Sequence, residues 1–207
     1  MGGPRLKALL EGYRRFRAGA WRQNADLFNR LACDGQAPRA IVIACADSRQ
    51  DPQFIFDAQP GELFVVRNVA ALVPAYAPDS GYHGTSAALE FAICALKVQQ
   101  VIVMGPAQCG GVHALIDGAP ETCGDFVQPW MEIARTARQH ALQHSGSRAE
   151  CLMMAEVETV RVSMANLLTF PWIHDRVERG EIEIHGLYFD VATGALSRVR
   201  PDGVETV

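Results

Sequence analysis

Two cysteines follow short apolar runs of the sequence, each near a point where a buried strand is expected to end. Cys45 closes the run IVIAC and is followed by Asp47 and Arg49, so that the pentapeptide CADSR carries a thiol, a carboxylate and a guanidinium. Cys109 comes shortly after the run VIVMG. Two thiolates that meet in space are strong ligands for tetrahedral zinc, whereas most free cysteines are small buried side chains. These residues alone leave both interpretations open.

The apolar runs have the composition of parallel strands that are buried on both faces. Three such segments span residues 39–48, 62–70 and 100–105. Ligands of open parallel sheets gather beyond the carboxyl ends of the strands. The sequence therefore predicts an α/β fold with a mostly parallel central sheet and flanking helices, in which Cys45 and Cys109 meet at one edge.

The remaining segments are expected to surround this sheet. Residues 84–98 repeat apolar side chains at helical spacing, with Thr85 or Ser86 as the N-cap. Residues 128–170 are also typical of helix until Phe-Pro-Trp interrupts the pattern. Residues 181–199 alternate about Ala-Thr-Gly, which predicts a C-terminal hairpin at the edge of the sheet.

The N-terminal residues 4–35 carry leucine and aromatic side chains at helical spacing, with basic outer faces. We expect a single domain over residues 1–207, with residues 1–35 as a helical arm. The apolar face of the arm packs either on its own subunit or on a partner, and periodicity does not choose between the two.

Composition argues against several partners and compartments. Lys and Arg number 19 against 23 Asp and Glu, and the net charge of −4 opposes general binding to nucleic acid or to an anionic membrane. The first twenty residues lack the apolar core of a signal peptide. Six cysteines are few for a disulfide framework in a chain of this length. We therefore expect a cytoplasmic protein with reduced thiols.

The motifs, taken together, resemble those of the β-class carbonic anhydrases. The resemblance rests on CADSR, GELFVVRNVA, SAALEFA and CGGV, and it continues through EVETVRVSMANLLTFPW to IHGLYFDVATGAL in the order of the family. It implies reversible hydration of CO2 to bicarbonate by zinc-bound hydroxide. It also implies a homodimer or homotetramer in which the N-terminal helices embrace the partner subunit.

The resemblance places the family's two thiolate zinc ligands at Cys45 and Cys109 and its catalytic dyad at Asp47 and Arg49. The third ligand of the family is a histidine, and its position is occupied by Pro106, which has no side-chain donor atom. In members of the family the aspartate of the dyad can bind zinc directly in a closed state, so the resemblance implies Asp47 as the third protein ligand. We expect Zn2+ to be weakly bound or absent and CO2 hydration to be much reduced.

Nearby residues leave alternatives open. Gly110 and Gly111 either present backbone N–H groups to a bicarbonate-sized anion or permit close packing, and we expect them to contact the substrate. His113 follows Cys109 by one helical turn and is a weaker candidate for a replacement ligand, and His83 is weaker still.

Arg67 and Asn68 either line the pocket or belong to the buried framework. The other four cysteines are expected to be structural: Cys33, Cys94, Cys123 and Cys151. Two further functions remain compatible with these residues. One is a non-catalytic family member that binds bicarbonate, another small anion or a partner protein, and the other is a hydrolase of a CO2 analogue such as CS2.

Overall fold

The computed structural model describes residues 4–207. The chain divides into two compact units, Met1–Ala37 and Pro38–Val207. The second unit contains both cysteines of interest and is described first.

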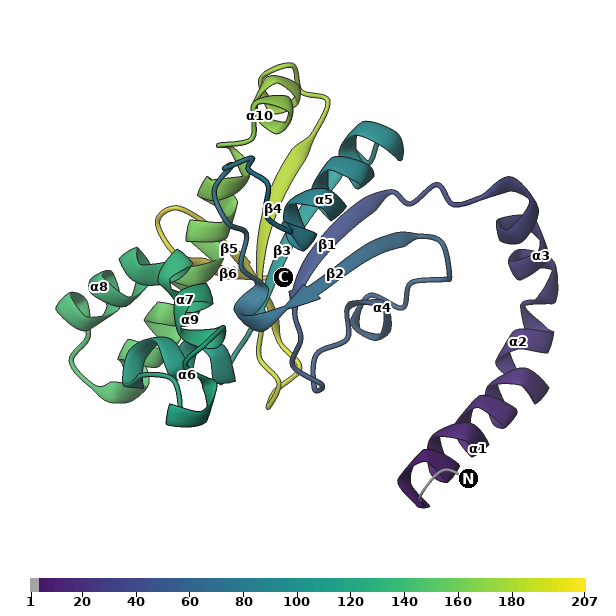
Figure 1. Cartoon of the computed structure of the whole chain (residues 1–207), viewed down its shortest axis with the longest axis horizontal. Helices are drawn as coiled ribbons and strands as arrows, with labels where there is room; N and C mark the ends of the chain where they lie inside the picture. The colour runs from purple at the N-terminus through teal and green to yellow at the C-terminus, as the bar shows by residue number, and fades with distance from the viewer. Residues whose placement is uncertain (1–3) are drawn as a thin grey trace. The chain divides into compact units, whose positions relative to one another are not determined.

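A six-stranded sheet forms the centre of the second unit, in the order β2-β1-β3-β4-β5-β6 (Figure 1). The strands are β1 (Ala40–Cys45), β2 (Leu63–Asn68), β3 (Gln100–Pro106), β4 (Glu183–Phe189), β5 (Leu196–Val199) and β6 (Val204–Thr206). The pairs among β2, β1, β3 and β4 are parallel, and those from β4 through β5 to β6 are antiparallel. The predicted α/β fold is confirmed, and β6 adds an edge strand beyond the predicted hairpin.

The register of the parallel strands decides what lies at their carboxyl ends. Cys45 is level with Asn68 of β2, and Ala44 is level with Met104 of β3. All six residues of β1 are buried, because the strand has a neighbour on each side and cover on each face. The segments that follow β1 and β3 therefore leave the sheet side by side.

Helices cover both faces of the sheet. Those of the second unit are α4 (Pro52–Ile55), α5 (Gly84–Glu90), α6 (Gly110–Asp117), α7 (Val127–Met131), α8 (Arg135–His144), α9 (Arg148–Leu167) and α10 (Pro171–Glu178). The main core joins Ile41, Ile43 and Val103 of the sheet to residues of α5, α6, α9 and α10. A smaller core on the opposite face centres on Val42 and Ala44 and includes Ile55 of α4. Alternate residues of β1 thus enter different cores, as a strand buried on both faces requires.

Two details of the helices differ from expectation. The segment predicted as one helix over 84–98 consists of α5 and a π-helical turn at Phe91–Ala95. The predicted N-caps are wrong, because α5 begins at Gly84 without a side-chain cap, and the Thr85 hydroxyl instead accepts a hydrogen bond of 3.2 Å from Asn68 Nδ2. The break predicted at Phe-Pro-Trp is confirmed, since Pro171 occupies the first turn of a new helix.

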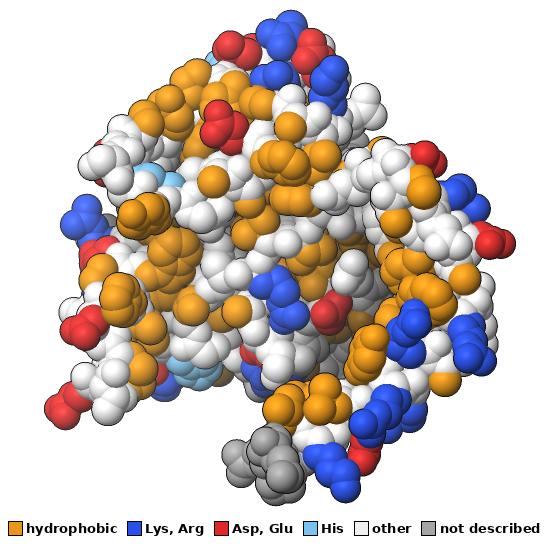
Figure 2. All heavy atoms as spheres, turned by 45° about the vertical axis from the view of Figure 1, so that its right-hand side comes forward, with side chains coloured by type: hydrophobic (Ala, Val, Ile, Leu, Met, Phe, Trp, Pro, Cys, Tyr) orange, Lys and Arg blue, Asp and Glu red, His pale blue; other side chains and the backbone are white. Residues whose placement is uncertain are grey.

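The first unit is helical: α1 (Pro4–Ala18), α2 (Ala20–Gln23) and α3 (Ala25–Asp34). Phe16 of α1 meets the ring of Phe28 edge to face, with the ring centroids 6.1 Å apart. Leu6, Leu9 and Leu10 are nevertheless exposed, at 48%, 73% and 48% of their surface. Figure 2 shows hydrophobic and basic side chains side by side along this unit.

No helix within residues 4–207 combines the length and the hydropathy needed to cross a lipid bilayer.

Candidate active site

The segment after β1, which we call the Cys45 loop (residues 45–51), carries the carboxylate and guanidinium predicted as a dyad. Arg49 donates from Nε to Oδ1 of Asp47 at 3.0 Å and from Nη2 to Oδ2 at 2.7 Å. Its backbone N–H also reaches Oδ1, at 2.9 Å. These bonds hold the pKa of Asp47 below its usual range. Both carboxylate oxygens therefore accept hydrogen bonds from the neighbouring arginine.

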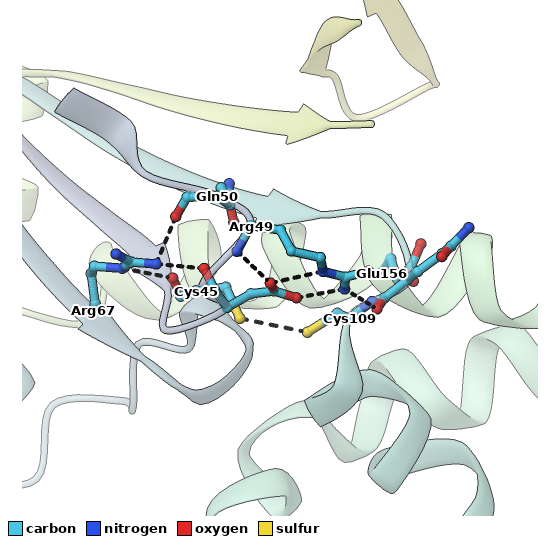
Figure 3. Close-up of polar contacts among 8 residues, drawn as sticks. Cys45, Arg49, Gln50, Arg67, Cys109 and Glu156 are labelled. Carbon is cyan, nitrogen blue, oxygen red and sulfur yellow. Dashed lines mark hydrogen bonds and ion pairs between the residues drawn. The ribbon is translucent and has the colours of Figure 1, made fainter. Parts of the chain in front are cut away.

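Arg67 of β2 fixes the backbone of the Cys45 loop. Its guanidinium donates to three carbonyl oxygens, those of Cys45 at 3.1 Å, Asp47 at 2.5 Å and Gln50 at 2.6 Å (Figure 3). The ion pair with Asp51 is longer, at 3.5 Å. Of the two alternatives for Arg67, these contacts favour the framework role, because the donors are directed at the main chain of the loop.

The segment after β3, which we call the Cys109 loop (residues 106–111), begins with the proline. Pro106 is the buried last residue of β3 and lies level with Phe189 of β4. The N–H that continues the pairing with β4 belongs to Ala107, which donates to the Phe189 carbonyl at 2.8 Å. N–H groups alternate in direction along a strand, so the nitrogen of residue 106 points toward β1. It lies beyond Met104, the last residue of β3 that pairs with β1. The proline nitrogen thus interrupts none of the pairs that β3 makes with β1 and β4.

Arg49 also links the two loops. Its Nη2 donates to the carbonyl of Gln108 at 3.1 Å, and Gln108 has a positive φ of 56°. The guanidinium that binds Asp47 thus also contacts the main chain directly before Cys109.

A buried glutamate of α9 binds the backbone of the Cys109 loop. Glu156 of α9 is 5% exposed, and its Oε1 accepts the backbone N–H of Cys109 at 3.0 Å. Its Oε2 accepts the hydroxyl of Tyr188 at 2.8 Å. Burial raises the pKa of Glu156, and burial together with the adjacent carboxyl raises the pKa of Tyr188. This contact was not predicted from the sequence.

The glycines after Cys109 have different surroundings. A Cβ added to Gly111 would lie 2.7 Å from Cγ1 of Val69 and 3.0 Å from the Cβ of Ala70, so this glycine permits the Cys109 loop to pack against the turn that follows β2. A Cβ added to Gly110 would meet nothing within 4 Å, and the residue is exposed. Close packing therefore accounts for Gly111 but not for Gly110.

The two loops bring the predicted thiols together. The sulfur atoms of Cys45 and Cys109 lie 3.7 Å apart, although the residues are 64 positions apart in the chain (Figure 3). Cys45 is 5% exposed and Cys109 1%. The hydrogen bond between them lowers the pKa of Cys45 to about 6, and the same contact with burial raises the pKa of Cys109. The contact therefore favours the thiolate form of Cys45 and the thiol form of Cys109.

The other candidates do not join the pair. His113 is near Asp117, with 4.0 Å between Nδ1 and Oδ2, and Nε2 of His83 lies 2.7 Å from Asp79. Within residues 4–207 no group of three or more His, Cys, Asp and Glu side chains is placed to hold a metal ion. Of the four remaining cysteines only Cys151 is buried, whereas Cys33 and Cys94 are exposed, so packing does not explain those two.

The donor set can be compared with what zinc requires. Two sulfurs bound to one tetrahedral zinc at about 2.3 Å lie about 3.8 Å apart, and the observed 3.7 Å agrees. Catalytic zinc usually has three protein ligands. Pro106 offers no third donor, and both oxygens of Asp47 are bonded to Arg49. As arranged, the residues fit two ligands of a zinc site and not the third.

Comparison with known proteins identifies the family of the chain. Residues 40–196 match the sequence profile of the family described as carbonic anhydrase. The mitochondrial β carbonic anhydrase 6 of Arabidopsis thaliana is 36% identical over 200 residues, covering 94% of this chain and 68% of that protein.

Solved structures agree with the sequence matches. The β-carbonic anhydrase CcaA superposes with a TM-score of 0.85 at 32% identity, covering 95% of this chain and 88% of that one. A tetrameric β-carbonic anhydrase of Sordaria macrospora gives a TM-score of 0.83 at 26% identity, covering 95% and 98%. The chain belongs to the carbonic anhydrase family, in its β class, a class of zinc lyases.

Proposed function

We propose that this chain is a β-carbonic anhydrase whose reversible hydration of CO2 to bicarbonate is impaired by Pro106. The observation that carries the proposal is the pair of sulfurs 3.7 Å apart beside an Asp47–Arg49 pair, with a residue that lacks a donor atom where the family has histidine. The site therefore has most of the expected groups and lacks one that touches the metal.

The chain's own residues have separate roles in this proposal. Zinc held by Cys45 and Cys109 would supply the Lewis acidity that makes water reactive near neutral pH. Arg49 keeps Asp47 ionised and orients its carboxylate, which acts as a hydrogen-bond acceptor for the reacting water. Glu156 and Arg67 act as positioning residues, because they hold the backbones that carry the two thiols.

The third protein ligand of the metal is proposed to be Asp47. For this its carboxylate must give up at least part of its bidentate contact with Arg49. The same carboxylate cannot then serve the water as the dyad requires. Weak zinc binding and reduced turnover therefore have one cause, the loss of a donor at residue 106.

Gly110 is proposed to contact the substrate together with Gly111. Gly110 is exposed at the first turn of α6, where backbone N–H groups without helical partners can bind a small anion. Gly111 has the additional packing role described above.

We propose a single domain with an N-terminal arm that assembles as a cytoplasmic homodimer or homotetramer. The exposed leucines of α1 support the assembly into an oligomer, because an apolar helix face of that kind is usually covered by a partner. The sedimentation coefficient of the purified chain, compared with that of a chain lacking residues 1–37, tests the role of the arm.

The decisive experiment on function restores the missing donor. In Pro106→His we expect zinc content to rise toward one ion per chain and kcat/KM for CO2 hydration to rise by about 100-fold or more, since loss of a group that only hydrogen-bonds a metal ligand already costs about 10- to 100-fold. Pro106→Ala is the matched control, because alanine also lacks a donor, and it should change neither quantity. Stopped-flow hydration and metal analysis provide the two readouts.

Equal kcat/KM for CO2 hydration in the unmodified chain and in Pro106→His would contradict the proposal that Pro106 impairs the activity. If neither hydrates CO2 although both bind bicarbonate, the non-catalytic alternative replaces the proposal. That alternative is favoured by the same observation, the missing donor at residue 106.

A further inference from the structure

We propose that Cys45 and Cys109 form a reversible disulfide, and that the disulfide and the metal are mutually exclusive states of one pair of thiols. This goes beyond the proposed hydration activity, because it concerns the same sulfurs in a chain whose metal site lacks a donor. It does not require the chain to hydrate CO2.

The separation of the sulfurs is the first argument. At 3.7 Å the two sulfur atoms are in van der Waals contact. A disulfide bond is about 2.05 Å long, and the sulfurs therefore need to approach by about 1.7 Å. Rotation about the Cα–Cβ bonds moves a thiol sulfur over distances of this size.

The second argument is that the contact between the sulfurs is held by protein groups. The carbonyl of Cys45 is bonded to Arg67, and the N–H of Cys109 is bonded to Glu156. The strands that lead to the two loops are direct neighbours in the sheet. None of these contacts uses a metal ion, so the thiols stay adjacent whether or not zinc is bound.

Pro106 provides the third argument. Metal coordination occupies the electron pairs with which sulfur attacks an oxidant, so a tightly bound zinc protects its cysteines. With no donor at residue 106, only two of the usual three protein ligands are in place. The thiols are therefore free for a larger fraction of time than in a complete site.

The chain has six cysteines, and within the described residues this is the one pair of thiols in hydrogen-bond contact. Their small exposure, 5% and 1%, limits access to small reagents. Hydrogen peroxide is therefore the class of oxidant that we propose.

The reaction balances in two steps. The sulfur of Cys45 attacks one oxygen of the peroxide, the O–O bond breaks, and one water leaves while a sulfenic acid forms. The sulfur of Cys109 then attacks the sulfur of Cys45, the S–O bond breaks, and a second water leaves. Two thiols lose two electrons and two hydrogens, and one peroxide is reduced to two waters.

The test uses the full chain. The protein is treated with hydrogen peroxide, its remaining thiols are alkylated, and its peptides are analysed by mass spectrometry. We expect a peptide pair joined through Cys45 and Cys109, lighter than the two reduced peptides by about 2 Da, that separates again with dithiothreitol. Zinc uptake should be lost after oxidation and recovered on reduction.

Two variants serve as controls. The double variant Cys33→Ser and Cys94→Ser removes the exposed thiols and should give the same joined peptide. In zinc-loaded Pro106→His the fraction of joined peptide should be at most about one tenth of that in the unmodified chain, because the bound metal protects the sulfurs.

The proposal is overturned if Cys33 and Cys94 are oxidised while no joined peptide forms. It is also overturned if Cys45 proceeds to a sulfinic acid without joining Cys109, or if zinc-loaded Pro106→His is joined to the same extent. A failure of Pro106→His to hydrate CO2 would count against the proposed function alone, since the joined peptide is measured without any activity.

Discussion

The Cys45 loop and the Cys109 loop are built alike and differ in what they offer a metal. Each follows a buried parallel strand, and each is held by a side chain from another element, Arg67 for the first and Glu156 for the second. The Cys45 loop keeps every residue of its motif, whereas the Cys109 loop has Pro106 where the family has a ligand. The groups that shape these loops are thus separate from the groups proposed to bind the ion. A ligand can be lost while the two sulfurs stay in place.

The largest effect is expected when the Cys45 loop loses its support. Arg67→Ala removes the donors to three carbonyl oxygens and should lower the free energy of unfolding by about 2 to 4 kcal/mol. Urea denaturation measures the loss, and the reactivity of Cys45 toward a thiol reagent should rise in parallel.

Arg67→Lys is the informative control for this change. An ammonium group keeps the charge but lacks the planar fork that reaches three carbonyls at once. Most of the destabilisation should therefore remain in the lysine variant. A lysine variant as stable as the unmodified chain would show that charge alone holds the Cys45 loop.

A somewhat smaller effect is expected in the Cys109 loop. Glu156→Ala leaves the N–H of Cys109 and the hydroxyl of Tyr188 without their partner and should cost about 2 to 3 kcal/mol of unfolding free energy. Glu156→Gln keeps an acceptor for Cys109 and a group that can pair with the tyrosine oxygen, so it should cost about 1 kcal/mol. Thermal unfolding compares the two, and equal losses would argue against hydrogen bonding as the reason for this glutamate.

Residue 106 itself should matter little to the fold. Pro106→Ala is expected to lower the free energy of unfolding by at most about 1 to 2 kcal/mol, since the nitrogen lies past the last pair of β3 with β1 and the change removes two buried ring carbons. Denaturation of both chains in the presence of a chelator makes the comparison free of metal. A loss above about 2 kcal/mol would mean that the proline has a structural role that the contacts do not reveal.

Much of this architecture could be predicted because β1 and most of β3 are buried on both faces, whereas β2, at the edge of the sheet, is only partly buried, against expectation. Continuous apolar runs mark β1, β2 and β3 in the sequence, and the position of a cysteine after a run gives its position at the sheet edge. The meeting of Cys45 and Cys109 follows from the parallel order of the strands. These are consequences of local composition and of one rule of topology.

The supports of the loops could not be predicted in the same way. Glu156 gives one local signal, because it falls on the helix face that also carries the buried Val160, Ser163 and Leu167. An acidic residue on such a face needs a buried partner, but its partner is a backbone N–H 47 positions away. Contacts at that sequence distance are fixed by tertiary packing and leave no pattern in the neighbouring residues.

The turn after β2 could not be predicted from the sequence for a related reason. Ala70 and Ala71 adopt positive φ values of 63° and 53°, which alanine rarely does. They are held there by Ser163 of α9, whose hydroxyl donates to the carbonyl of Ala71 and accepts the N–H of Val73, both at 3.1 Å. The side chain of Asn68 also bridges the turn, because it accepts the N–H of Leu72 and donates to the carbonyl of Leu72, both at 2.8 Å. An Ala-Ala sequence by itself predicts no such turn, because the side chains that hold it belong to other residues.

The smallest expected effect concerns the far end of the elements that support the Cys109 loop. Arg148 at the start of α9 forms an ion pair with Asp117 at the end of α6, and both side chains are about half exposed. Arg148 holds the pKa of Asp117 below its usual range. A depressed acidic pKa contributes stability that is present above the usual pKa value and disappears as the pH falls.

Arg148→Ala should thus lower Tm slightly at neutral pH, with the difference shrinking between about pH 5 and pH 3. A Tm difference that stays constant over this range would assign the effect to lost packing of the arginine side chain. The expected decrease is small since exposed pairs are screened by water, and this contrasts with Glu156 on the same helix, which is buried together with Cys109.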